Sequence, residues 1–197
     1  MAKSYVQVSW AKEIGANGKP VLLPDNEPTE QGTYICPDMD GATNWMSPAF
    51  NPQTGWMYVT VREECATYYS WAEDYREGQS YWGGNTTRKR GSGYGALRAI
   101  DPLTGKLQWE FRYPTPSMAG VLSTASGIVF SGDSEGNFIA FDARTGKVLW
   151  HMQTGAAIVA APTTFMLNGR QFVLIPSGTT LIAFALPETK GPHNGSP

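Results

Sequence analysis

The sequence predicts an all-β fold assembled from repeated units, and three observations lead to this prediction. Two segments, residues 97–109 (LRAIDPLTGKLQW) and residues 137–150 (NFIAFDARTGKVLW), align without a gap between their Asp and Trp residues. Their matching residues are each 41 positions apart: Asp101 and Asp142, Gly105 and Gly146, and Trp109 and Trp150. The chain is also rich in turn-forming residues, with 22 Gly and 14 Pro. Repeats spaced by roughly 40–50 residues are typical of propeller blades.

Each copy is expected to form two strands joined by a tight turn. Residues 137–141 alternate and are rich in apolar side chains, as a half-buried strand does. The carboxylate of Asp142 can accept hydrogen bonds from backbone N–H groups two or three residues later. Gly146 then closes the turn because glycine adopts a positive φ without a Cβ clash. A Trp in the returning strand can bury roughly 200 Å² between adjacent sheets. One copy would fit any antiparallel hairpin, but two gapless copies favour a blade repeat.

The length bounds the number of blades. At roughly 40–50 residues per blade, a chain of 197 residues holds about four blades. Propellers close with about four to eight blades, so the chain is either a small closed propeller or part of a larger one. Outside the repeats, the strand candidates are residues 5–10, 33–36, 46–50, 56–61, 127–131, 163–167, 171–175 and 180–186.

Two segments depart from the repeat pattern. Residues 62–92 are polar, aromatic and irregular, and they are expected to form a loop excursion over a blade or at the rim of a funnel. Long loops of this kind are often functional. The charged pairs at 63–64 and 73–74, and the basic cluster at 88–90, are expected to be solvated. Residues 188–197 are expected to be a disordered tail, which leaves one domain over residues 1–187.

Composition excludes some classes of function. The net charge of −2 argues against nucleic acid as a main partner. No apolar run is long enough to span a membrane, and the first ten residues lack the apolar core of a signal peptide. Read literally, the chain is made inside the cell, although an internal piece of a longer protein would have the same appearance. The two cysteines, Cys36 and Cys65, fit either a disulfide or two buried thiols.

The residues alone show no catalytic or metal-binding constellation. His151 and His193 have no Cys or His partner at the spacing of zinc ligands. No nucleophile elbow, P-loop or dinucleotide-binding glycine motif is present. Function must therefore be inferred from similarity.

The chain resembles the C-terminal part of the pyrroloquinoline quinone (PQQ)-dependent alcohol dehydrogenases, the quinoprotein methanol and ethanol dehydrogenase family. AIDPLTGKLQW and AFDARTGKVLW follow that family's repeat, A-x-D-x-x-T-G-K-x-x-W. GATNWMSPAFNPQTGWMYV resembles the family segment in which an Asn and a Trp approach the quinone. SMAGVLST and TGAAIVAAPTT resemble segments of the final blades. The resemblance covers residues 5–187 and implies a partial propeller, about four blades of an eight-bladed quinoprotein ring.

The resemblance also implies a set of site residues. Asn44 and Trp45 match the quinone-facing pair. Met118 stands where methanol dehydrogenases carry a Trp that faces the quinone. Ile158 and Val159 match the point where the last blade approaches the pocket. Cys36 and Cys65 match the family's second disulfide, which implies an oxidising compartment such as the periplasm.

The implied activity is oxidation of an alcohol to an aldehyde with PQQ and a calcium or lanthanide ion acting as Lewis acid. The family's adjacent Cys-Cys pair is absent, and its catalytic Asp and metal ligands are not recognisable in this chain. By resemblance they belong to the N-terminal half. The chain would then supply one wall of the cofactor site and be inactive alone. Its partners would be the N-terminal half or a second copy, with a small alcohol as substrate. The alternative is a non-enzymatic propeller scaffold of the same repeats that binds protein partners.

Overall fold

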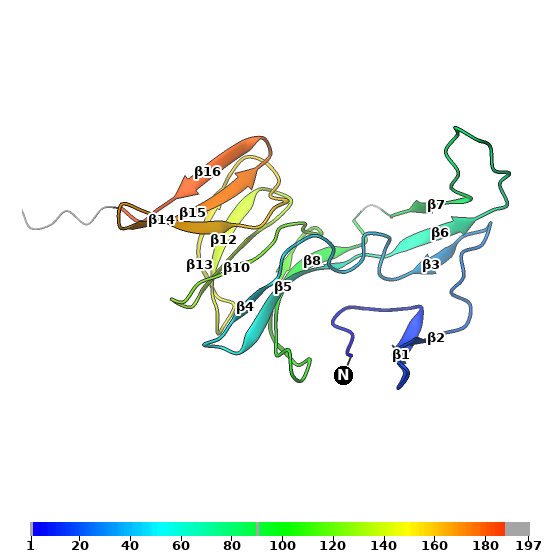
Figure 1. The fold of residues 1–197 in the computed structure, drawn as a ribbon, viewed down its shortest axis with the longest axis horizontal. Coiled ribbons are helices and arrows are strands. Elements are labelled where there is room, and N and C mark those ends of the chain that lie inside the picture. The colour runs from blue at the N-terminus through cyan, green and yellow to red at the C-terminus, as the bar shows by residue number, and fades with distance from the viewer. Residues whose placement is uncertain (1, 90, 188–197) are drawn as a thin grey trace, which may run out of the picture.

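The structure is a computed structural model that describes residues 2–89 and 91–187, so the expected tail at 188–197 lies outside the described residues. Figure 1 shows several small antiparallel sheets side by side, with one arm that projects from them. The described residues form strands and no helix, and hence no helix long and apolar enough to cross a membrane. The predicted all-β fold is confirmed.

Two four-stranded antiparallel sheets have the form of propeller blades. The first blade contains β4 (Ala49–Asn51), β5 (Trp56–Glu63), β8 (Tyr94–Ile100) and β9 (Leu107–Tyr113). The second blade contains β10 (Leu122–Ser123), β11 (Ile128–Gly132), β12 (Asn137–Asp142) and β13 (Val148–Gln153). In the second blade each strand pairs with the next along the chain. In the first blade β5 pairs with β8, because the chain leaves the blade between them to build the arm.

A third sheet continues the series. It contains β14 (Thr163–Leu167), β15 (Arg170–Ser177) and β16 (Thr180–Phe184). Among the described residues β16 pairs only with β15, so this blade has three strands. Two complete blades and one incomplete blade confirm the prediction of a partial propeller.

The repeat motif folds as its sequence predicts. Asp142 Oδ1 accepts hydrogen bonds from the backbone N–H of Arg144 at 3.0 Å and of Thr145 at 2.8 Å. Asp101 Oδ1 does the same for the two equivalent residues of the first blade. Gly146 has a φ of 69°, in the region that favours glycine. Each motif therefore joins the last two strands of its blade.

The Trp that ends the first motif packs against the turn of the next blade. Trp109 Nε1 donates to the carbonyl oxygen of Ala143 at 2.9 Å, and Tyr58 Oη donates to the same oxygen at 2.9 Å. A Cβ on Gly146 would lie 2.6 Å from the Trp109 ring. The core between the two blades is built mainly from these buried residues: Tyr58, Leu97, Ala99, Tyr113, Val121, Val129, Ile139, Phe141 and Ala143.

The interface between the second and third blades is less complete. Phe138, Ile158 and Ile175 are fully buried there. Trp150 meets the ring of Phe184 edge-on at 5.4 Å between ring centroids, but it remains 42% exposed. The chain after β16 reads Ala-Leu-Pro and has no Asp-x-x-Thr-Gly turn to cover this Trp.

The segment 62–92 differs from its prediction as an irregular excursion. It contains β6 (Ala66–Ser70) and β7 (Gly84–Thr87), which form a three-stranded sheet with β3 (Thr33–Ile35). This sheet is the arm in Figure 1, and it lies on the side of the first blade away from the third. The side chains of β6 and β7 are mostly half-exposed or exposed, so these strands need no apolar alternation in the sequence. Their hydrogen bonds to one another hold the arm together.

The N-terminal prediction also needs correction. Residues 5–10 do not form a strand; β1 (Ala11–Ile14) pairs instead with β2 (Pro20–Leu22). Ser9 exchanges hydrogen bonds with Cys36, through its N–H at 3.0 Å and its Oγ at 2.8 Å. This segment therefore lies against the base of the arm rather than in a blade.

Cys36 and Cys65 form a disulfide, as the resemblance implied, with Cα atoms 4.4 Å apart. The bond joins the end of β3 to the junction of β5 and β6. A loop of about 30 residues closed in this way stabilises a fold by roughly 3 kcal/mol in the chain-entropy model. It fixes the arm to the first blade.

Candidate cofactor-binding site

Three loops come together where the chain enters the first strand of each blade. They are residues 43–48 before β4, residues 117–121 before β10 and residues 157–162 before β14. Two backbone bonds tie them, from Val121 N to Ser47 O at 2.9 Å and from Gly120 N to Ala160 O at 3.3 Å. We call this surface the three-loop wall.

The wall depends on close contact between its second and third loops. Gly120 is buried, and a Cβ on it would lie 2.5 Å from the Cβ of Ala161. Real Cβ atoms do not approach one another so closely, so any larger residue at 120 would push the loops apart. Small residues on both sides therefore allow the loops to meet.

The structure brings most of the predicted site residues to this wall. Asn44 is exposed, and the Trp45 ring is 58% exposed. Trp45 Nε1 points to the carbonyl oxygen of Val159 at 3.4 Å, although the two residues are 114 positions apart. Val159 is itself 51% exposed, and Met118 is half-buried. The aromatic ring of Trp45, the amide of Asn44 and the apolar side chain of Val159 thus lie on the same wall.

Ile158 lies differently from the other predicted residues. Its side chain has no exposed surface and packs among Ala119, Phe138 and Ile175. It also fills the space above Gly132, where a Cβ would come within 2.7 Å of it. Ile158 therefore supports the wall from the core and offers no surface for a ligand.

A group of charged residues lies behind the wall at the base of the arm. We call it the arm-base cluster, and it consists of Asp38, Asp40, Arg62, Glu64 and Arg88. Arg62 and Asp38 are almost fully buried, and their side chains meet at 3.2 Å. Arg62 Nη1 lies 3.0 Å from Asp40 Oδ2, and Arg62 Nη2 pairs with Glu64. Arg88 reaches Asp38 at 2.5 Å and Asp40 at 2.6 Å.

The charges in this cluster shift the pKa values of Asp40 and Arg88. Burial disfavours the charged form of Asp40, but the hydrogen bond from Arg62 and the positive charges of Arg88 and Arg62 outweigh it, so the pKa of Asp40 is lowered. Burial likewise opposes the charge on Arg88, yet Asp38 and Asp40 raise its pKa. Asp40 and Arg88 are therefore both charged at neutral pH.

The comparisons with known proteins agree with this architecture. Residues 111–173 match the family described as glucose/ethanol/alcohol dehydrogenase, beta-propeller domain. The quinoprotein alcohol dehydrogenase PedH of Pseudomonas putida is 34% identical over 181 residues, which are 87% of this chain and 30% of that protein. The lanthanide-dependent methanol dehydrogenase of Methylacidiphilum fumariolicum is 37% identical over 187 residues, covering 90% of this chain and 30% of its own length.

Solved structures extend the match to three dimensions. A quinohemoprotein alcohol dehydrogenase from Pseudomonas putida superposes with a TM-score of 0.84 at 29% identity, covering 92% of this chain and 29% of that one. A europium-containing methanol dehydrogenase superposes with a TM-score of 0.81 at 36% identity, and the match covers 89% of this chain and 32% of that one. The chain is thus similar over most of its length to quinoprotein alcohol dehydrogenases. It spans about 30% of the length of the curated relatives it matches.

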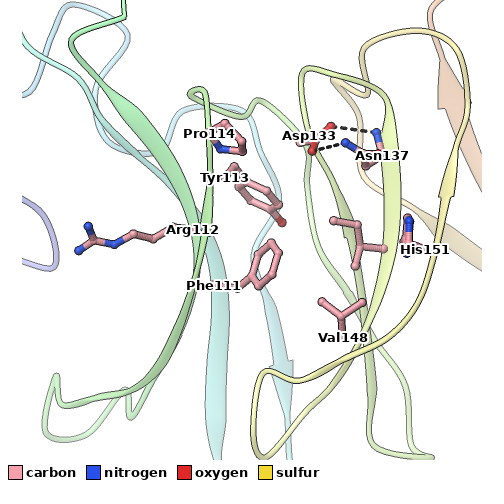
Figure 2. A pocket seen from close by; sticks show the side chains of 9 residues that line it. Phe111, Arg112, Tyr113, Pro114, Asp133, Asn137, Val148 and His151 are labelled. Carbon is pink, nitrogen blue, oxygen red and sulfur yellow. Dashed lines mark hydrogen bonds between the residues drawn. The ribbon is translucent and has the colours of Figure 1, made fainter.

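A hollow lies between the first two blades (Figure 2). It measures about 260 Å³ and shares no residue with the three-loop wall. Tyr113 points into it, and burial raises the pKa of its phenol. Asp133 binds the side-chain amide of Asn137 at 2.8 Å and two backbone N–H groups of the same turn. The carboxylate of Asp133 is thus engaged in holding the turn.

Over residues 2–89 and 91–187, no group of three or more His, Cys, Asp or Glu side chains is placed to hold a metal ion.

The arm-base cluster was not predicted from the sequence. Glu64 and Arg88 were expected to be solvated loop charges, but both form ion pairs there. One signal was available: Arg62 ends the apolar run of β5, where an unpaired charge would be costly to bury. Its carboxylate partners lie up to 24 positions away, so the pairing itself is visible only in the fold.

Proposed function

We propose that this chain forms one wall of the PQQ site in a PQQ-dependent alcohol dehydrogenase, which oxidises an alcohol to an aldehyde. The observation that carries the proposal is the three-loop wall. It places the exposed Trp45 ring, the Asn44 amide and Val159 together on one open surface. The chain is similar over nearly its full length to quinoprotein alcohol dehydrogenases.

The residues of the wall fit a flat polyanionic ring system. The Trp45 face offers a planar apolar surface for packing. The Asn44 amide can donate a hydrogen bond to a quinone oxygen or a carboxylate. Val159 and Met118 would border the bound quinone and keep water from its edge. The quinone supplies the two-electron redox chemistry when bound, and these side chains orient it.

We further propose that the proton acceptor, the ligands of a calcium or lanthanide ion and the rest of the quinone site come from the remainder of the enzyme. The chain spans about 30% of its relatives, which leaves room for those groups. The N-terminal half of the propeller, or a second copy of the chain, would complete the ring. The isolated chain is then expected to bind quinone weakly and to oxidise no alcohol.

The disulfide supports a location. Structural disulfides persist in oxidising compartments and are rare in the cytosol. The Cys36–Cys65 bond therefore favours the periplasm for this protein.

A titration of the 197-residue chain with PQQ, with and without calcium or a lanthanide, tests the proposal. Tryptophan quenching and quinone absorbance report binding. Saturable binding that weakens about tenfold in Asn44→Ala, the loss of roughly one good hydrogen bond, supports the wall. Asn85→Ala, an exposed change on the arm, serves as the matched control and is expected to bind like wild type.

The titration is repeated with the N-terminal half supplied in trans. Binding and alcohol oxidation that appear only in the mixture support the proposed division of the site. No binding in either form would contradict it and favour a non-enzymatic scaffold that uses the same blades. Alcohol oxidation by the purified chain alone would contradict the proposed inactivity.

A further inference from the structure

We propose that Arg62 is a positioning residue that aligns the quinone-facing side chains of the three-loop wall. The proposal rests on the function proposed above and concerns how the wall keeps its shape. Arg62 is in β5, outside the wall, and its side chain is 3% exposed. It therefore acts through the residues it holds.

Arg62 binds the segment just before the first loop through both its backbone and its side chain. Its backbone N–H donates to the carbonyl oxygen of Ala42 at 2.8 Å. Its Nη1 atom lies 3.0 Å from the carboxylate of Asp40. The carbonyl oxygen of Asp40 in turn accepts the side-chain amide of Asn44 at 3.3 Å. The orientation of the Asn44 amide thus depends on where Arg62 holds Asp40.

Arg62 also reaches the second loop. The same Nη1 atom lies 3.9 Å from Met118 Sδ, a distance at which a thioether accepts a weak hydrogen bond. One guanidinium therefore links the segment that precedes the first loop to the second loop. The third loop is attached to the first through Trp45 and Val159. A shift of Arg62 would accordingly move all three loops together.

Stability alone is a weak reason for such a cluster. Removing charges from water costs several kcal/mol per ion, and apolar residues of similar volume often stabilise a core as well. The planar fork of Arg can meet several acceptors in a fixed geometry, which a Lys ammonium cannot do. The arrangement of Arg62 with Asp38, Asp40 and Glu64 suits geometric control of the neighbouring loop.

The first blade contains a matched residue for comparison. Arg98 is also buried and pairs with two carboxylates, Glu63 at 2.7 Å and Glu110 at 2.7 Å. It lies on β8 and has no bond to a residue of the wall among those observed. Arg98→Lys therefore disturbs a buried ion pair in the same sheet without touching the wall.

The test compares Arg62→Lys with Arg98→Lys in the full chain. PQQ titration is expected to show about tenfold weaker binding for Arg62→Lys and less than about twofold change for Arg98→Lys, even if both lower the melting temperature. Arg62→Lys combined with Asn44→Ala is expected to bind no more weakly than either single variant, because coupled residues are not additive. Equal binding by the two Lys variants, or additive losses in the double variant, would overturn the proposal.

A second measurement keeps the inference separate from the proposed function. The NMR signals of the Asn44 side-chain amide and the Trp45 indole N–H report the wall without any ligand. Both are expected to shift or broaden in Arg62→Lys and to stay in place in Arg98→Lys. If wild type binds no quinone, the proposed function fails while these signals still decide the inference. Unchanged signals in Arg62→Lys would overturn it.

A milder variant covers the case in which Arg62→Lys does not fold. Asp40→Asn keeps the backbone carbonyl that accepts the hydrogen bond from the Asn44 side-chain amide, and it leaves Arg62 paired with Asp38. It weakens the ion pairs of Arg62 and Arg88 with Asp40, the residue that holds the Asn44 amide, and leaves the pair of Arg62 with Asp38 in place. The Asn44 amide signal is expected to move in this variant, and a signal identical to wild type would contradict the positioning role.

Discussion

Gly146 shows how a single residue of the repeat serves two purposes. Its φ of 69° closes the turn, and its missing Cβ makes room for the Trp109 ring, which would lie 2.6 Å from an added carbon. Gly146→Ala therefore combines backbone strain of roughly 1–2 kcal/mol with overpacking of about 1–3 kcal/mol. We expect a loss of about 3 kcal/mol in the free energy of unfolding, measured by urea denaturation.

Gly55 provides the control for this prediction. It closes the corresponding turn between β4 and β5 with a φ of 73°, and no atom lies within 4 Å of its added Cβ. Gly55→Ala is expected to lose only the strain, roughly 1–2 kcal/mol. Equal losses in the two variants would show that the Trp109 contact contributes nothing.

At this scale the sequence predicted the residues whose role is local. Asp142 and Gly146 close one turn, so their spacing alone reveals that role, whereas the contact between Gly146 and Trp109 depends on how the blades pack. Asn44 and Trp45 were reached through a resemblance carried by a contiguous segment. Arg62 was missed because its role comes from partners before and after it that only the folded arm brings together.

At the scale of the strand pair, β8 and β9 carry an ion pair across the first blade. Arg98 is directly opposite Glu110 in the register, and Glu110 also meets Arg112 at 2.5 Å. Burial opposes the charge on Glu110, but the hydrogen bonds from Arg112 and Arg98 lower its pKa below the usual value of 4.5. A lowered pKa stabilises the fold above the unfolded-state value, and this stabilisation is lost as the pH falls through the folded-state value.

Glu110→Gln is therefore expected to be less stable than wild type by about 1 kcal/mol at pH 7, the size of a good cross-strand charge pair. The difference should hold down to about pH 5 and vanish as wild-type Glu110 becomes protonated at lower pH. Urea denaturation at a series of pH values measures it. Glu77→Gln, on an exposed loop of the arm, controls for the lost charge. A difference that does not change with pH would contradict the ion-pair explanation.

The elements were predictable where side chains alternate against a core. The strands of the second blade follow the apolar pattern, and their places in the sequence are confirmed. The arm was not predictable in this way, because Gly84–Thr87 has no apolar face and is a strand only through its pairing with β6. The sequence encodes the arm through the disulfide and the charged cluster, both of which are long-range.

At the scale of the whole molecule, the third blade presents an unfinished face. Within the described chain β16 has one neighbouring strand, and a free edge of this kind is a template for pairing. Large apolar side chains are exposed on the third blade and on the neighbouring strand β13: Trp150, Phe165, Met166, Leu167 and Leu181. We expect this face to bind either the remainder of the propeller or a second copy of the chain.

Sedimentation velocity over a range of concentrations tests this expectation. Wild type is expected to show concentration-dependent association. Leu181→Lys places a charge on β16, and burying a charge at an apolar contact costs more than about 1.4 kcal/mol, so association should weaken at least tenfold. Leu103→Lys changes a more exposed leucine in a turn of the first blade and should associate like wild type. A wild-type chain that stays monomeric, both alone and with the N-terminal half, would show that the open edge is tolerated in solution. The incomplete third blade would then be a finished surface, and the chain would need no partner to cover it.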